Sequence, residues 1–507
     1  MPTRFDFARF ALVVCLTTST VALAAEDAVF KAGFAEKDIT PEVGMEQPGG
    51  YGKSYHTKFH DACKVRASVF DDGKKRVAVV GLDALFIPRS IVLAARDAIQ
   101  KRVGIAPECV LISASHSHSS GPVAGIFPGE YDHASPLVQK LAYEQSTTVH
   151  PQYAKKVEQA LIDAVCEAND TRVSAKCGVG KGIEDQVAFN RRFRMRDGLT
   201  ATHPRQGNPD IVEVAGPIDP EVGVIGAWDQ RGRLIGCVVN YACHATTNPG
   251  GISANYIFYL EQAVRGFFGP DVVVVFVPGA SGDITQVDNL SPYDRQQPEQ
   301  SARFVGGRIG AETVKVLLTM EPGNLGPVDA KNEVLKVKHR IPRPERVAQS
   351  LELVQKDRSK VDITEWTFAK EIVLLDAKLK LGTVADVEVQ ALQVGPVVFV
   401  TDSAEYFCQF GLDIKKGSPF PFTFPVSLAN GSVGYVPTEE AFSPRGGGYE
   451  TRLSSYSNLE ITAGKKFADA GIALAKQLTP GKVPTLPPAP PYKKNAWAYG
   501  AVPPELD

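Results

Sequence analysis

Apolar runs of strand length alternate with amphipathic stretches along most of the chain. Continuous apolar runs predict buried strands over residues 76–86, 108–115 and 271–283, a strand over 332–341, and two strands within 386–407. Apolar residues at helical spacing predict helices over residues 88–104, 153–169, 255–269 and 302–320, and a polar helical stretch ends near 381. Residues 223–244 predict a hairpin that turns at "DQRG".

This alternation predicts an α/β protein with mixed β-sheets covered by helices. Strands that are apolar throughout are typical of sheets buried on both faces. The hairpin signal favours a mixed sheet over a purely parallel one. No repeat of fixed period interrupts the pattern.

The two ends of the chain differ from the part between them. Residues 1–24 carry Arg4 and Arg9, then an apolar stretch and an A-x-A pattern, which predicts a signal peptide and an exported protein. An anchor helix is the alternative, but the stretch is short for a bilayer span. Residues 481–507 are rich in proline and predict an extended tail. The catalytic domain is expected over residues 25–480.

Charge and cysteine content exclude two classes of function. The formal net charge is −2 over 507 residues, which argues against nucleic acid as a partner. The seven cysteines after residue 25 are scattered and form no C-x-x-C pair. A disulfide-dense scaffold or a structural zinc knot is therefore not expected.

Four of the predicted strands run into polar clusters where they end. These clusters are "ASHSHSSGP", "CHATTNPGG", "GASGDITQVDN" and "TDSAEYF". Ligands of α/β folds gather in the crevice beyond strand ends, so the four ends are expected to converge on one site.

His116 and His118 are the first candidate metal ligands within these clusters. In extended backbone, residues i and i+2 point to one side, so both imidazoles would face the same place. His244 and Glu405 follow other strands and would complete a set of zinc ligands. Each residue also has an ordinary structural interpretation: hydrogen-bonded loop histidines, and a glutamate at a helix N-terminus.

Six segments, in the same order along the chain, resemble the neutral/alkaline (non-lysosomal) ceramidase family. The resemblance runs from about residue 30 to 478. Its segments are "KAGFAEKDITPEVG…GGYG", "SASHSHSSGP", "FNRRF", "NYACHATT", "TDSAEYFCQFGLDIKK" and "LANGSVGYVPTEEAF".

The resemblance implies a single zinc ion and a set of residues around it. Its ligands would be His116, His244, Glu405 and Tyr435. His118 would be a further polar group facing the site, and Arg191 matches the active-site arginine of the family. Both would stabilise the developing oxyanion or donate to the leaving amine. A phenol has a pKa near 10, and a nearby dication would favour the deprotonated form of Tyr435.

The chain departs from the family pattern at the position of its serine. The corresponding stretch, "ASGDITQVDN", keeps Gly282 and Asp283 but has Thr285 in place of the serine and Gln286 in place of a proline. Asn255 stands where related sequences show an acid. The immunoglobulin-like domain that follows the family's catalytic domain is not expected here.

These observations predict an exported zinc-dependent hydrolase that cleaves an N-acyl amide. The substrate would be ceramide or a related lipid or small molecule, and peripheral membrane contact is a further expectation. Asp283 and Thr285 would position the nucleophile, and the threonine favours direct attack by water over an acyl-enzyme. Two alternatives stay open: a zinc hydrolase of another substrate class, such as an amidohydrolase barrel, and a non-catalytic exported binding protein on the same scaffold.

Overall fold

The structure, a computed structural model, describes residues 1, 29–293, 297–492, 499–500 and 502–507. The expected signal peptide, residues 1–24, lies outside these residues except for Met1. Among the described residues, no helix has the length and apolar character that crossing a bilayer requires.

The observed helices and strands agree in order with the predicted alternation. The described α-helices are α1 (Arg89–Val103), α2 (Pro136–Tyr143), α3 (Pro151–Asp170), α4 (Tyr256–Phe268), α5 (Pro298–Thr319), α6 (Pro344–Leu353), α7 (Ile363–Leu379), α8 (Cys408–Gly417) and α9 (Ala463–Ala475). The described strands are β1 (Lys31–Asp38), β2 (Lys64–Asp71), β3 (Arg76–Leu82), β4 (Val110–Ala114), β5 (Val173–Ile183), β6 (Phe189–Asn190), β7 (Arg192–Met195), β8 (Thr200–Thr202), β9 (Ile211–Val214), β10 (Glu221–Asp229), β11 (Leu234–Tyr241), β12 (Val273–Pro278), β13 (Ile284–Thr285), β14 (Val328–Lys338), β15 (Val384–Val394), β16 (Val397–Thr401), β17 (Glu405–Tyr406), β18 (Phe422–Val426) and β19 (Tyr435–Val436).

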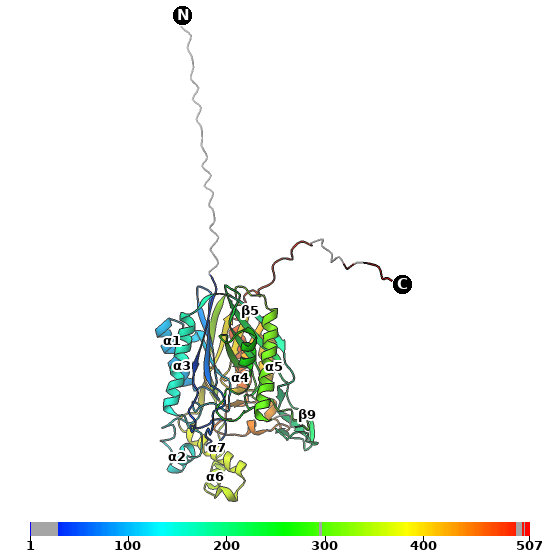
Figure 1. The fold of residues 1–507 in the computed structure, drawn as a ribbon. Coiled ribbons are helices and arrows are strands. Elements are labelled where there is room, and N and C mark those ends of the chain that lie inside the picture. The colour runs from blue at the N-terminus through cyan, green and yellow to red at the C-terminus, as the bar shows by residue number, and fades with distance from the viewer. Residues whose placement is uncertain (2–28, 294–296, 493–498, 501) are drawn as a thin grey trace.

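Two mixed sheets form the centre of the molecule, as the sequence predicts. The larger has the order β12-β11-β10-β5-β1-β2-β3-β4, and the smaller has the order β14-β15-β16-β18 (Figure 1). The predicted hairpin is the antiparallel pair β10–β11, while β3–β4, β11–β12 and β16–β18 pair in parallel. The sequence did not indicate β1, β2 or β5, and the predicted polar helical stretch is two helices, α6 and α7.

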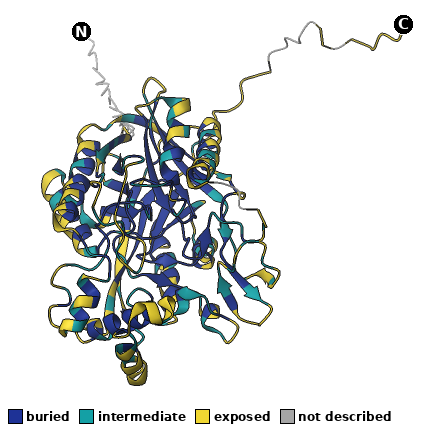
Figure 2. Ribbon diagram, turned by 60° about the horizontal axis from the view of Figure 1, so that its bottom comes forward, coloured by how far each residue is buried: buried dark blue, intermediate teal, exposed yellow. Residues whose placement is uncertain are grey.

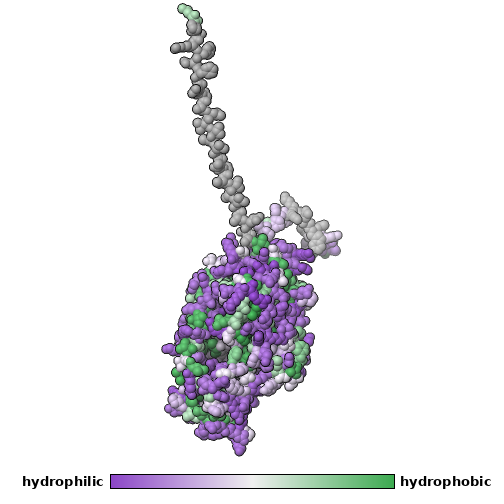
Figure 3. Space-filling view, turned by 90° about the vertical axis from the view of Figure 1, so that its left-hand side faces the viewer, coloured by the Kyte–Doolittle hydropathy of each residue, from purple (hydrophilic) through white to green (hydrophobic). Residues whose placement is uncertain are grey.

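Helices cover the outer faces of the sheets. Helix α3 packs on β1 and β2, α5 packs on β5 and β10, and α9 packs on β14, β15 and β16. Figure 2 shows the consequence: the central strands are buried, and the exposed residues lie on the outer helices and loops. Seen from the side of α1 and α3, the surface is mainly hydrophilic, with hydrophobic side chains in scattered patches (Figure 3).

The larger sheet curls so that β12, at one edge, packs against β3 near the other. Gly81 of β3 permits this contact, because a Cβ there would lie 2.1 Å from the carbonyl oxygen of Phe276 in β12. The smaller sheet joins at the same place: Asn240 of β11 donates to the carbonyls of Val277 (3.0 Å) and Pro425 (2.9 Å), the latter in β18. The carboxyl ends of strands from both sheets therefore meet in one region.

Two further features concern the cysteines and the C-terminal segment. The seven cysteines after residue 25 are all buried, and none forms a disulfide in the part of the chain described here. Beyond the last helix, Figure 1 shows the C-terminal segment extending away from the sheets, in the region where the sequence predicts a proline-rich tail.

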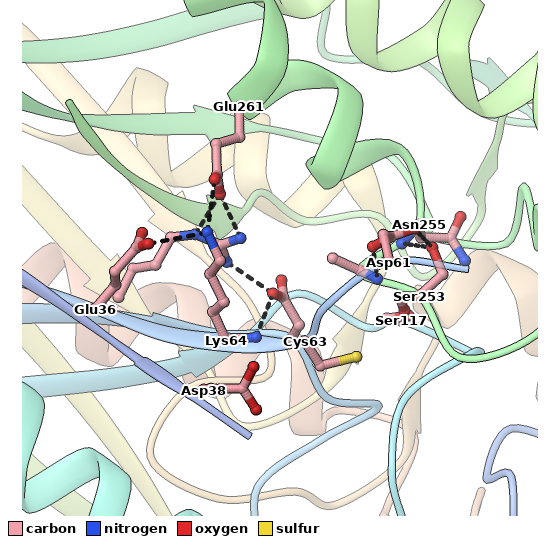
Figure 4. Close-up of polar contacts among 12 residues, drawn as sticks. Glu36, Asp38, Asp61, Cys63, Lys64, Ser117, Ser253, Asn255 and Glu261 are labelled. Carbon is pink, nitrogen blue, oxygen red and sulfur yellow. Dashed lines mark hydrogen bonds and ion pairs between the residues drawn. The ribbon is translucent and has the colours of Figure 1, made fainter. Parts of the chain in front are cut away.

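A network of buried charges fastens α4 to the strands. Arg66 of β2, which is 2% exposed, donates to Asp83 Oδ2 and to Glu261 Oε2 of α4, both at 2.8 Å. Lys64 extends the network by binding Glu36 at 2.9 Å and Glu261 at 2.8 Å (Figure 4). Buried charges are tolerated only when they are paired, so this arrangement depends on every partner being present.

We expect Arg66→Met to lower the free energy of unfolding by about 3–5 kcal/mol, because it leaves Asp83 and Glu261 buried without their cation. The matched control is Lys101→Met, which breaks the exposed Lys101–Asp97 pair of α1 and should cost about 1 kcal/mol or less. Urea unfolding followed by circular dichroism measures both. Equal losses in the two variants would contradict a structural role for the buried network.

Candidate metal centre and active-site cavity

The four strand ends named by the sequence converge, as predicted. His116 follows β4, His244 follows β11, and Glu405 begins β17 shortly after β16. The cluster after β12 contributes through its backbone, because the carbonyl of Ser281 contacts His244 at 2.6 Å. The side chains of His116, His244 and Glu405 are all buried.

Both histidines are oriented by backbone carbonyls. Nδ1 of His116 donates to Leu85 O (2.8 Å), and Nδ1 of His244 donates to Ser281 O (2.6 Å). The remaining Nε2 atoms point at one carboxylate oxygen: Glu405 Oε2 lies 3.2 Å from His116 Nε2 and 3.0 Å from His244 Nε2. Fixing one ring nitrogen in this way is how proteins direct the other toward a metal.

His118 joins the same cluster, although its backbone is not an extended strand. Strand β4 ends at Ala114, and His116 has a left-handed φ of 65°. That conformation is costly for a residue with a side chain and is found mostly at functional sites. The rings of His116 and His118 lie edge to face, 4.7 Å apart, with their Nε2 atoms 3.2 Å from each other. The prediction that both face one side is confirmed, for a different geometric reason.

Asp61 supports the loop that carries His118 through the segment of Ser253 and Ala254. Its carboxylate accepts hydrogen bonds from Ser253 Oγ and from the backbone N–H of Ala254 (2.8 Å). Ser117 Oγ donates to the carbonyl of Ser253 at 2.8 Å, which ties the histidine loop to this segment (Figure 4). Asn255, where the family pattern has an acid, accepts a hydrogen bond from the N–H of Thr247 at 2.8 Å.

The cluster has a charge distribution suited to binding a cation. Burial opposes ionisation of Glu405, but His116 and His244 outweigh it and hold its pKa well below the usual range. Burial, aided by Arg191, lowers the pKa of His244 to about 3. Burial and the other two histidines lower the pKa of His118 well below its ordinary value. Near pH 7 His118 and His244 are therefore neutral and Glu405 is negative.

Arg191 lies behind the cluster with its guanidinium fully engaged. It donates to Glu450 (3.1 Å) and to the carbonyl of Gly282 (2.7 Å), and it contacts Tyr435 OH (3.2 Å) and His244 Nε2 (3.3 Å). Burial alone would lower the pKa of Arg191, but the surrounding tyrosines and Glu450 raise it well above its usual value. A permanent cation therefore holds several of the predicted site residues together.

Tyr435 lies next to the cluster, where the resemblance places it. Its hydroxyl is 2.8 Å from the hydroxyl of Tyr449, and its strand β19 pairs with β17 so that Tyr435 is the direct partner of Glu405. Burial and the charge of Glu405 raise the pKa of Tyr435 well above its ordinary value. Deprotonation of this phenol therefore requires a strong positive charge beside it.

Asp283 and Thr285 bond to the scaffold around the cluster. The Asp283 carboxylate accepts from Asn190 Nδ2 and from the backbone N–H of Cys408, both at 2.8 Å. The Thr285 hydroxyl lies 3.4 Å from Gln286 Oε1. Both side chains are buried, and neither lines the cavity described next. Their assigned roles in positioning a nucleophile stay predictions.

A cavity of about 830 Å³ opens onto the cluster. His116, His118, Glu405 and Tyr435 line its inner end. The sequence reasoning missed several other residues in its wall, among them Tyr51, Glu371, Tyr449 and Tyr456. The only sequence signal for Tyr449 is the preceding run of glycines, two of which take positive φ values.

The residues present fit a divalent metal ion. His116, His118 and His244 form a group whose ligand nitrogens lie within 4.8 Å of one another. The Nε2 atoms of His116 and His118 lie 3.2 Å apart, and Glu405 Oε2 lies 3.2 Å from His116 Nε2. Imidazole nitrogens and carboxylate oxygens are typical zinc ligands. The geometry is therefore consistent with a metal cofactor at this group of histidines, and the assignment of His116, His244, Glu405 and Tyr435 as its ligands stays a prediction.

Comparison with known proteins bears on the fold of the chain. No family model matches the chain. The neutral ceramidase of Pseudomonas aeruginosa is 23% identical over 349 residues, which are 65% of this chain and 48% of that protein. Its crystal structure superposes with a TM-score of 0.62 at 20% identity, over 92% of this chain and 77% of that one. The chain has a divergent, ceramidase-like fold.

A second solved structure gives the same result. A ceramidase described as complexed with C2 superposes with a TM-score of 0.64 at 17% identity, over 91% of this chain and 78% of that one. The ceramidase-like chain spans about half the length of the curated relative that it matches. The resemblance predicted from six short segments is thus confirmed at the level of the fold, which carries mixed sheets covered by helices.

The acid sensitivity of the metal-free protein tests the environment of His244. Its imidazole has a pKa of about 3 in the folded state and near 6.5 when unfolded, so the unfolded state binds more protons between these values. Stability is therefore lost as the pH falls through this window. For His244 alone, linkage gives a loss of up to about 2 kcal/mol between pH 7 and pH 5.

The measurement is urea unfolding after treatment with a chelator, at pH 7 and at pH 5. His244→Gln should reduce the stability difference between the two pH values, and His133→Gln, which changes an exposed histidine, should not. An identical pH dependence in His244→Gln and wild type would mean that His244 is not held neutral.

Proposed function

We propose that this protein is a zinc-dependent amide hydrolase that cleaves an N-acyl amide, ceramide or a related N-acyl lipid. The observation that carries the proposal is the convergence of His116 and His244 on one carboxylate oxygen of Glu405, beside a large cavity that His116 and Glu405 line. The ceramidase-like fold supports amide cleavage as the reaction.

The proposed metal would act as a Lewis acid toward the amide carbonyl and its attacking water. Residues of the chain would transfer protons and hold the site in position. His118 faces the cavity as a neutral imidazole, so it can pass a proton between water and the leaving amine. Arg191 would hold His244 and Tyr435 in position, because its donors are already bound to protein groups.

A lipid substrate is supported by the outer part of the cavity. Its wall includes Leu381 and Val384, which are 67% and 48% exposed and lie at the end of α7 and the start of β15. Exposed aliphatic side chains beside a cavity mouth favour contact with an acyl chain or with a membrane surface. Peripheral membrane contact and export after signal-peptide cleavage belong to this proposal.

We expect His116→Ala to lose bound metal and turnover together. The change removes a proposed ligand, and turnover should fall by more than about 100-fold, since even an outer partner of a metal ligand is worth up to that much. Metal content by atomic spectroscopy and amide hydrolysis should be measured on the same preparation. His133→Ala, which lies outside the cluster, is the matched control.

The substrate is tested by setting ceramides of several chain lengths against water-soluble N-acyl amines. Ceramide turnover that is lost in His116→Ala would support the proposal in full. A protein with one zinc ion that hydrolyses neither class would favour the binding-protein alternative. A metal-free wild-type protein would refute the zinc assignment itself.

The nucleophile is tested at Thr285. Its hydroxyl contacts Gln286 rather than the histidine cluster, so we expect Thr285→Ala to keep turnover within about tenfold of wild type. Mass spectrometry of rapidly quenched reactions should find no acyl group on the protein. An acylated Thr285 peptide would establish an acyl-enzyme instead, and turnover that needs the threonine hydroxyl without acylation would mean that Thr285 positions the attacking water.

A further inference from the structure

Tyr456 lies in the cavity wall with a buried hydroxyl that has no hydrogen-bond partner among the described residues. Leaving a buried hydroxyl unbonded is unfavourable, and such groups are rare in native proteins. A buried, unbonded donor that faces a cavity is therefore a candidate contact for whatever the cavity binds.

The position of Tyr456 is firmly set by its surroundings. Its carbonyl accepts from the N–H of Tyr435 at 3.1 Å, and its own N–H donates to Ser454 Oγ at 3.3 Å. Its ring lies edge to face with the ring of Tyr435, 5.6 Å away, and 6.1 Å from that of Phe86. The ring is therefore held between Tyr435 and Phe86, with the side chains of Glu405 and Ser432 near its hydroxyl.

The other donors around the cluster are already used. The Arg191 guanidinium bonds to Glu450, Gly282, Tyr435 and His244. The hydroxyls of Tyr435 and Tyr449 bond to each other. A phenol can donate one hydrogen bond, and the hydroxyl of Tyr456 makes none among the described residues.

We propose that the hydroxyl of Tyr456 binds the amide group of the substrate, donating a hydrogen bond to its carbonyl oxygen. This assignment rests on the proposed function, since it needs an amide in the cavity. It makes Tyr456 a substrate-binding residue beside the proposed metal ligands, in a segment that neither the strand-end pattern nor the family motifs single out.

The first test measures the ligand-free protein. Tyr456→Phe removes only an unbonded oxygen, so its thermal unfolding temperature should not fall. The matched variant is Tyr241→Phe, which removes a buried hydroxyl bonded to the carbonyl of Glu184 at 2.7 Å and should lower it. If Tyr456→Phe loses as much stability as Tyr241→Phe, the hydroxyl is a structural group and the proposal is wrong.

The second test measures binding of a simple amide, N-methylhexanamide, by isothermal titration calorimetry on the metal-loaded protein. Tyr456→Phe should bind it roughly tenfold more weakly than wild type, the usual effect of one lost hydrogen bond. Tyr259→Phe, on the outer helix α4, should bind it like wild type. Equal binding by Tyr456→Phe and wild type, or no binding by wild type, would overturn the proposal.

Turnover separates the two proposals from each other. If wild type binds N-methylhexanamide through Tyr456 but hydrolyses no N-acyl amide, the proposed reaction fails and the binding role of Tyr456 stands. If wild type hydrolyses ceramide or another N-acyl amine while Tyr456→Phe does so with unchanged KM and kcat, the reaction stands and the role of Tyr456 fails.

Discussion

One buried carboxylate oxygen, Oε2 of Glu405, is the contact around which the rest of the site is arranged. Burying a carboxylate is unfavourable unless charge or hydrogen bonds compensate. Here the Nε2 atoms of two imidazoles lie against it, at 3.2 Å from His116 and 3.0 Å from His244, and acceptor atoms that face one another in this way are an arrangement that a bound cation would stabilise. Both imidazoles are fixed in turn by backbone carbonyls, so the carboxylate is held by groups that cannot turn away. Three separate strand ends are thereby locked to one point.

The backbone around Glu405 shows how closely these strand ends pack. A Cβ on Gly282 would lie 2.3 Å from the Glu405 carbonyl, so only glycine permits the approach. The carbonyl of Gly282 accepts a hydrogen bond from Arg191, which also contacts His244 and Tyr435. Arg191 therefore acts from behind the cluster as a support. That position is difficult to reconcile with a guanidinium free to bind a reacting oxygen, whereas His118 and the hydroxyl of Tyr456 both face the cavity.

Much of the fold and part of the site were predictable from the sequence, because the signals were local. Apolar runs ending in polar clusters identified the strand ends and led to His116, His244 and Glu405. The sequence could not indicate Glu450 or Tyr456, since Glu450 lies in a single 3-10 turn and Tyr456 in the loop after it, and neither segment has hydrophobic periodicity. Helices α6 and α7 were predicted as one stretch because the segment between them, residues 354–362, contains no glycine or proline to indicate a break.

The hydrogen bonds of Asp283 explain how the chain can keep Gly282 and Asp283 of the family motif and still have Thr285 in place of its serine. Both oxygens of the Asp283 carboxylate are used: one accepts from Asn190 of β6 and the other from the N–H of Cys408 at the start of α8. Burial raises the pKa of Asp283, which is consistent with a structural carboxylate enclosed by the protein. Gly282 and Asp283 thus serve the scaffold of the site, and that requirement is independent of the chemistry at the next hydroxyl. A chain can keep both residues and the metal-binding geometry while replacing the serine, provided that water rather than a side-chain oxygen attacks the amide.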